Sequence, residues 1–194
     1  RDRIKGCTDS FLEYDFSRTK SETEKFFWQQ FCDNYLEIVK DRLYNADKYS
    51  KEAVESAKYT LYTVNLAILK LMAPIMPHIT EEIYHLYFAE IDGFKSIHVS
   101  DWPKYDKNLV DEKIEFAGDN AISVISGVRK YKSEKNLSLN KPIKTLTIKC
   151  DEKTKKILEP VLKDIKATVK AEEIVFGNKA DFECQEDIKL GIDM

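Results

Sequence analysis

Residues 51–84 read KEAVESAKYTLYTVNLAILKLMAPIMPHITEEIY, and this stretch decides the fold. Its first part carries apolar side chains at alternating steps of three and four residues: Val54, Ala57, Leu61, Val64, Ile68 and Leu71. This spacing is the period of a helix with one buried stripe. The pattern stops at Pro74 and Pro77, because the residue before a proline is disfavoured in helical geometry. We therefore predict one long helix over 51–73 and a shorter one that begins at His78.

Two other segments repeat the helical period. Residues 22–44 place five side chains on one stripe: Trp28, Cys32, Tyr35, Val39 and Leu43. Residues 111–132 do the same with Ile114, Ala117, Ala121, Val124, Val128 and Tyr131. Long amphipathic helices of this kind bury their stripes against each other, as in an antiparallel bundle. Residues 92–106 have no sustained period and are predicted as a connection, with 97–99 briefly extended.

The pattern changes from Lys144 to the end of the chain. Leu146 and Ile148 alternate with polar side chains, which is typical of a strand. A helical period follows over 152–170, then a short strand over 172–177 and a third strand over 182–192. This order predicts a small unit that combines strands with one helical segment.

The fold class that follows is mainly α, with two domains. We predict an antiparallel helical bundle over residues 1–143 and a small α+β subdomain over residues 144–194. No segment approaches the roughly 18 uninterrupted apolar residues of a membrane helix, so we expect a cytoplasmic protein without a membrane partner. The chain begins at Arg1 without an initiating Met, and we expect it to be a fragment of a longer protein.

The charge of the chain restricts how it could bind nucleic acid. The formal net charge is -3 with a pI near 5.8, which argues against a generic nucleic-acid binder held by charge. We expect no DNA partner, and any RNA binding must come from local patches. Between residues 127 and 149, however, seven positive side chains face only Glu134, a local excess of six. Such a run could follow a phosphate backbone, or it could be a solvated helix face and a lysine-lined edge strand. The candidate RNA contacts, including a weaker cluster near residue 45, are Lys40, Arg42, Lys48, Arg129, Lys130, Lys132 and Lys135.

Catalytic and metal-binding patterns are not found. The sequence has no phosphate-binding glycine loop, no nucleophile elbow and no His-Glu-x-x-His pair, and its four cysteines are scattered. His78 and Glu82 are one helical turn apart and could pair as a base and its orienting group, although a histidine beside Pro77 more often serves structure. Trp28 could stack on a base, although an aromatic stripe is more often core. We predict no catalytic residue, no metal site and no cofactor in this chain.

Three segments carry a resemblance to a known family. LKLMAPIMPHITEEIY, residues 69–84, resembles the helix-Pro-helix segment in the anticodon-binding bundles of valyl-, isoleucyl-, leucyl- and methionyl-tRNA synthetases. FFWQQFCDNYLEIVKDRLY, residues 26–44, and VRKYKSEKNLSLNKPI, residues 128–143, are similar to the valyl form. The ordered motifs cover most of residues 20–177.

The resemblance implies that the chain is the C-terminal, tRNA-binding part of a class I aminoacyl-tRNA synthetase of the valyl type. It implies a valine tRNA as partner, a monomer, and a parent enzyme that uses ATP with Mg in domains absent here, because the His-Ile-Gly-His and Lys-Met-Ser-Lys-Ser types of signature are missing. The α+β tail resembles archaeal-type enzymes, whereas many members end in a coiled coil. The alternatives are the isoleucyl or leucyl enzyme, and a helical scaffold for protein interactions.

Overall fold

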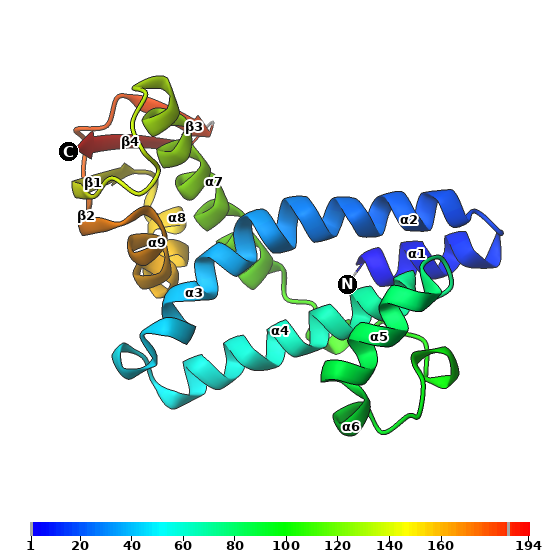
Figure 1. Cartoon of the computed structure of the whole chain (residues 1–194). Helices are drawn as coiled ribbons and strands as arrows, with labels where there is room; N and C mark the ends of the chain where they lie inside the picture. Colours follow the sequence, from blue (N-terminus) through cyan, green and yellow to red (C-terminus); the bar gives the residue numbers. More distant parts are fainter. Residues whose placement is uncertain (1, 186) are drawn as a thin grey trace. The chain divides into compact units, whose positions relative to one another are not determined.

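The chain divides into two compact units in the computed structural model, which describes residues 2–185 and 187–194 (Figure 1). The first unit comprises the residues up to Leu36 and Arg42–Val110, and the second comprises Glu37–Asp41 and Asp111–Met194. The first is helical, and the second combines helices with a four-stranded sheet. This agrees with the predicted fold class, a helical bundle with a small α+β part. Among the described helices, none is both long and apolar enough to cross a membrane.

The first unit opens with helices that the apolar period revealed only in part. Helix α1 was not predicted, and the helix predicted over 22–44 is one section of a longer helical run. Asp15 begins this run by accepting a hydrogen bond of 3.0 Å from the backbone N–H of Arg18. The elements are α1 (Asp2–Leu12), α2 (Phe16–Lys25), the π-helical segment η1 (Phe26–Leu36) and α3 (Glu37–Tyr44), followed by the short η2 (Ala46–Lys48).

The π-helical geometry of η1 changes which side chains are buried. Its i→i+5 hydrogen bonding takes more residues per turn than an α-helix, so the stripe predicted from a period of 3.6 rotates off the core. Phe31 is 3% exposed, whereas Trp28 is 61% exposed. The Phe27, Phe31 and Tyr35 rings instead follow each other in steps of four, with centroids 6.3 and 5.9 Å apart. The prediction that Trp28 belongs to the buried stripe is therefore wrong.

The helix-Pro-helix segment forms as predicted. Helix α4 (Lys51–Met72) begins after Ser50, whose side chain accepts from the backbone N–H of Ala53 at 3.2 Å. Helix α5 (Pro77–Tyr87) has Pro77 in its first turn. A backbone N–H at this position has no acceptor within the helix, so proline loses no helical hydrogen bond there. The connection after it contains α6 (Ala89–Asp92), η3 (Ile97–Val99) and η4 (Lys107–Leu109). The extended conformation predicted for 97–99 is wrong, because these residues form a 3₁₀ turn.

Contacts at two places in the first unit attach its later segments to the long helices and to α1. Tyr84 of α5 and Phe88, the residue after this helix, form a buried cluster with Ala73 and Ile97, and residues of α4 pack against it. At the other place, the Trp102 ring lies edge-on to Phe11 with centroids 5.1 Å apart. Its indole N–H donates to Thr8 Oγ1 at 2.9 Å. The connection after α6 is thereby attached to α1.

The second unit is built on a sheet with strand order β2-β1-β4-β3. Strand β1 pairs in parallel with β2 and antiparallel with β4, and β3 pairs antiparallel with β4. The helical segment between β1 and β2 is the crossover that a parallel pair requires. The elements are α7 (Glu112–Glu134), β1 (Ile143–Lys149), α8 (Glu152–Leu158), η5 (Glu159–Val161), α9 (Leu162–Val169), β2 (Ala171–Phe176), β3 (Phe182–Gln185) and β4 (Ile188–Asp193).

Two predictions for this part of the chain are corrected by the structure. The single strand predicted over 182–192 is a pair of antiparallel strands, because the apolar alternation continues through the reversal between them. Helix α7 does not bury its stripe against other long helices. Its Ala121, Val124, Ile125 and Val128 lie in one hydrophobic core with residues of the strands, α8 and α9. The domain boundary at 143/144 stays a prediction.

Candidate nucleic-acid interface

The predicted basic run lies on the last turns of α7, the turn over residues 135–142 and strand β1. Val124 and Val128 of α7 face the core of the second unit. The charged side chains that follow them on α7 therefore differ in how far they are exposed to solvent. The Lys130 side chain is 65% exposed, with its Nζ 4.0 Å from Glu134 Oε1 and 5.8 Å from the centroid of the Phe182 ring. Arg129 is half-buried. Lys130 is thus presented to solvent at the end of α7.

Lys132 has a different role from the one predicted. It is 1% exposed, and its ammonium donates to the backbone carbonyls of Leu139, Lys141 and Val169 at 2.9, 2.7 and 3.1 Å. Burial and the charge of Lys170 lower its pKa. A buried side chain whose three N–H donors are all occupied has no donor left for a phosphate. The predicted RNA contact of Lys132 is therefore corrected to a structural one.

The turn over residues 135–142 is held by several hydrogen bonds. Asn136 has a positive φ of 53°, a conformation that asparagine tolerates better than most residues. The backbone N–H of Leu137 donates to Lys132 O at 2.8 Å, and that of Lys141 donates to Ser138 O at 3.0 Å. Asn140 Oδ1 accepts from Lys170 Nζ at 2.9 Å. The turn presents Lys135 and Lys141 at its exposed surface.

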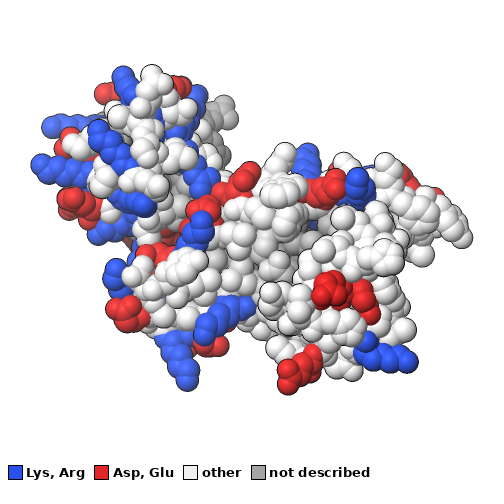
Figure 2. All heavy atoms as spheres, viewed as in Figure 1, with Lys and Arg blue, Asp and Glu red and all other residues white. Residues whose placement is uncertain are grey.

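The surface around this turn is strongly positive. Residues 129–170 contain 13 Lys or Arg and 5 Asp or Glu, an excess of eight in a chain of net charge -3. Figure 2 shows Lys and Arg side chains over β1, β2 and β4, with acidic side chains between them. Strand β1 lies in the interior of the sheet, so its lysines do not protect a sheet edge as the alternative interpretation supposed. The excess charge is instead available to attract an anion.

The second predicted cluster surrounds the end of α3. Lys40 is exposed and pairs with Glu37 on the same helix. Arg42 is half-buried on α3, and Lys48 is exposed in η2. By its contacts Lys40 belongs to the second unit, together with Arg129, Lys130 and Lys135, whereas Arg42 and Lys48 belong to the first.

Trp28 lies at an apolar groove of the first unit, which the sequence did not reveal. The groove has a volume of about 390 Å³, and the Trp28 ring lies beside Phe27 with centroids 4.9 Å apart. The local signal was the Phe-Phe-Trp string, which a regular helical period assigns to the core. The other apolar lining includes Ile68, Met72, Met76, Ile79 and Ile83.

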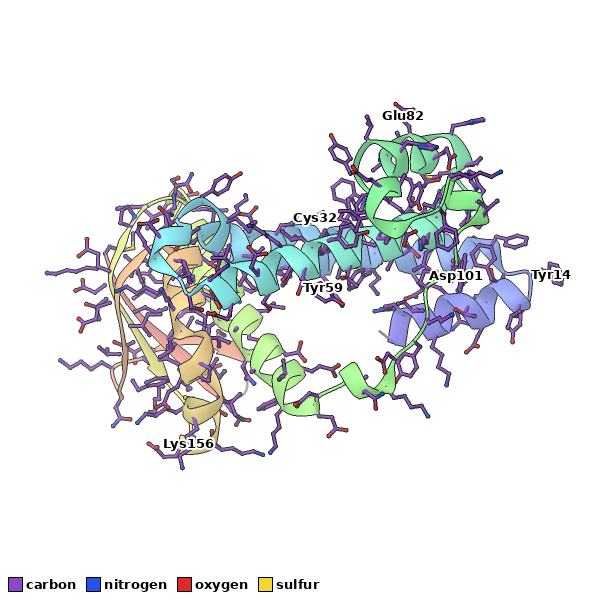
Figure 3. The ribbon with its side chains drawn as sticks, turned by 90° about the horizontal axis from the view of Figure 1, so that it is seen from below. Tyr14, Cys32, Tyr59, Glu82, Asp101 and Lys156 are labelled. Carbon is purple, nitrogen blue, oxygen red and sulfur yellow. The ribbon has the colours of Figure 1, made fainter. Side chains whose placement is uncertain are left out.

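The predicted pairing of His78 with Glu82 is not formed. Both residues are exposed, Glu82 points outward from α5 (Figure 3), and no hydrogen bond joins them within the described part of the chain. The neighbouring Glu81 is the structural residue: it accepts from Ser96 Oγ at 3.0 Å and Ile97 N–H at 2.9 Å, and lies 3.0 Å from His85 Nε2. Burial raises the pKa of Glu81, but the combined effect of these hydrogen bonds is larger and opposite. The pKa of Glu81 is therefore held below its ordinary value.

The cysteines do not form a reactive site in the geometry observed. Cys7, Cys32, Cys150 and Cys184 are free thiols, and burial raises the pKa of the Cys184 thiol to about 11. A thiol with a raised pKa is a poor nucleophile at neutral pH. Over residues 2–185 and 187–194, no group of three or more His, Cys, Asp or Glu side chains is placed to hold a metal ion.

Comparison with known proteins places this chain in a family. Residues 1–148 match the family described as the anticodon-binding domain of tRNA ligase. The chain is 38% identical over 172 residues to a valine--tRNA ligase of Wolbachia pipientis, covering 88% of this chain and 19% of that protein. It is also 38% identical over 176 residues to the Pyrococcus furiosus enzyme of the same name, covering 90% and 19%. The Rickettsia felis enzyme gives 38% over 180 residues, covering 92% and 20%.

These relatives are much longer than the chain described, which spans about a fifth of their length. The family match nevertheless includes the three segments on which the resemblance rests: the Phe-Trp helix, the helix-Pro-helix and the turn after α7. The similarity extends to bacterial and archaeal relatives alike. This chain belongs to the family of anticodon-binding domains of tRNA ligases.

Proposed function

We propose that this chain binds the anticodon arm of a tRNA, as the non-catalytic tRNA-recognition part of a valine-tRNA ligase. The match of residues 1–148 to the anticodon-binding family carries the proposal. The valine-tRNA ligases among its relatives support the valine type. In this proposal the parent enzyme charges valine tRNA with the use of ATP and Mg, in domains outside this chain, and acts as a cytoplasmic monomer.

The physical basis of binding is a local basic surface on an acidic chain. Because the net charge is -3, the contact is confined to places where positive side chains gather, and screening by salt should weaken it strongly. Lys135, Lys141 and Lys170 surround one ordered turn and can hold phosphates there. The remaining candidate contacts are Lys40, Arg42, Lys48, Arg129 and Lys130.

We also propose that two parts of the chain have different roles in tRNA binding. Residues 1–143 contact the arm, and the α+β residues 144–194 support the end of this surface. The family match ends at residue 148, near this boundary. The packing of α7 on the sheet means that the support acts through a shared core.

A direct binding experiment tests the proposal. The full chain would be titrated against fluorescently labelled anticodon stem-loops of valine, isoleucine and leucine tRNAs and a hairpin of equal length with an unrelated loop, from low to physiological salt. We expect the valine arm to bind most tightly and all affinities to fall with salt. Equal binding of all four hairpins at low salt would contradict anticodon recognition. Preference for the isoleucine or leucine arm would assign the chain to that synthetase.

A protein-interaction scaffold is the second candidate, and the exposed apolar groove at Trp28 favours it. It predicts that no hairpin binds even at low salt. The same titration therefore separates the two functions.

A further inference from the structure

We propose that Lys132 is a positioning residue for RNA binding, which holds the basic turn 135–142 in place without touching RNA itself. The inference deepens the proposed function and rests on it. It concerns how the positive surface is built, since Lys132 lies beneath that surface and not on it.

The ammonium of Lys132 joins two backbone segments that are separate in sequence. Two of its acceptors, Leu139 O and Lys141 O, belong to the turn, and the third, Val169 O, lies at the end of α9. It is only 1% exposed, and its three donors match the three carbonyls. One side chain from α7 thus fixes the turn to α9.

The same contacts set the positions of the exposed lysines. The Lys141 carbonyl accepts one of the Lys132 hydrogen bonds, while the Lys141 side chain is exposed. Lys170 follows Val169 directly, has a positive φ of 57° and donates to Asn140 of the turn. Loss of the three Lys132 hydrogen bonds should therefore free the turn and move Lys135, Lys141 and Lys170 relative to one another. A binding surface that must be ordered at each encounter binds more weakly than one already in place.

An apolar side chain would fill the space of Lys132, so its charge has to be explained. A buried ammonium is costly to desolvate, and its neighbour Lys170 adds repulsion. Its donors, however, satisfy three carbonyl groups, of which that of Val169 is in a buried hydrogen bond and the other two are partly buried. An apolar side chain would leave these carbonyls without the hydrogen bonds. The lysine is best explained by the need to hold these carbonyls together.

The test compares Lys132→Met, Asn140→Ala and, as a matched loss of one charge on the same helix, Lys113→Met, which is exposed at the start of α7. Amide hydrogen exchange of the free full chain comes first. We expect Lys132→Met to speed exchange at Leu137 and Lys141 while the amides of α4 and α5 keep their protection. Asn140→Ala, which removes only the exposed bond to Lys170, should speed exchange in the turn to a smaller degree. Unchanged exchange in both variants would overturn the inference.

Binding to the valine anticodon stem-loop comes second. We expect Lys132→Met to weaken affinity about tenfold and Asn140→Ala a few fold, while Lys113→Met changes it little. If Lys132→Met unfolds the second unit, Asn140→Ala decides: faster turn exchange without weaker binding overturns the positioning role. If the parent chain binds no hairpin, the proposed function fails, whereas binding by all variants with equal affinity overturns only the role of Lys132.

Discussion

The phenol of Tyr84 donates a hydrogen bond of 2.9 Å to the carboxylate of Asp92. The same carboxylate forms an ion pair with Lys70, whose Nζ lies 2.9 Å from Asp92 Oδ2. One acidic side chain thus joins α4, α5 and α6. Tyr84 has no exposed surface. Burial, with the hydrogen bond and negative charge of Asp92, raises the pKa of Tyr84 to about 12.

Replacement of Tyr84 by Phe should lower the free energy of unfolding by about 2 kcal/mol, since a hydrogen bond to a charged group contributes roughly 1.5–3 kcal/mol. Urea denaturation at neutral pH measures this. Tyr87→Phe is the control, because Tyr87 lies on the same helix and is 69% exposed. An equal loss in both variants would contradict the assigned role of Tyr84.

The same pair should produce a loss of stability at alkaline pH. The folded pKa of Tyr84, about 12, is above its ordinary value of 10.0, so the folded state favours the protonated phenol. Its contribution is fully present below pH 10 and is lost as the pH rises through 12. The stability difference between the parent and Tyr84→Phe should therefore shrink over this window.

Glu81→Gln should destabilise the segment around Ile97, because a neutral amide accepts more weakly from Ser96 and the Ile97 N–H. The folded pKa of Glu81 is below its ordinary value of 4.5. Its contribution is thus present above that value and is lost as the pH falls through the folded pKa. Thermal melting across this acid range should show the loss in the parent and in Glu82→Gln, the neighbouring exposed control, but not in Glu81→Gln.

Gly127→Ala should destabilise the second unit by roughly 1–3 kcal/mol, the usual cost of overpacking. An added Cβ would lie 2.5 Å from Cys184 Cβ and 2.8 Å from Leu190 Cδ1, where α7 meets the sheet. Gly118→Ala is the control on the same helix, with nothing within 4 Å of its added Cβ. It should stabilise the protein by roughly 0.5–1 kcal/mol. Denaturation curves that moved in the same direction would argue against this packing.

Phe31→Ala and Trp28→Ala test the rotation introduced by η1. We expect Phe31→Ala to cost about 3–5 kcal/mol, because Phe31 is buried in the first unit. Trp28→Ala should cost much less. In a separate variant that keeps Trp28 and carries Trp102→Phe, the Trp28 fluorescence should be readily quenched by acrylamide. A shielded Trp28 would show that the helix keeps an α-helical period in this region.

Lys135→Ala with Lys141→Ala should weaken binding to every tRNA arm to a similar degree. The slope of log affinity against log salt should fall by roughly 0.7–0.9 for each phosphate contact that is lost. Equilibrium titrations over a salt series measure both effects. A change in the preference among arms, with no change in slope, would mean that these lysines contact bases.

The sequence determined the elements whose signals are local. Helix α4 begins at its Ser50 cap and ends before Pro74, and β1 follows from the alternation around Leu146. These features depend on neighbours a few residues away, so spacing and residue type suffice to predict them. Helix α1 was not predicted, although Ile4, Cys7 and Phe11 follow helical steps of three and four residues, because these few apolar positions stand among polar and charged ones. Its buried Cys7 lies against Thr23, which is distant in sequence.

The tertiary structure alone decided what lies opposite each helix face. The spacing of Val124 and Val128 shows that they share a face, but it does not show whether a helix or a sheet covers that face. Lys132 was counted with the exposed lysines for the same reason: its charge is visible in the sequence, whereas the three carbonyls that bury it come from Leu139, Lys141 and Val169. Burial is a property of long-range contacts, and these are set only when the chain has folded.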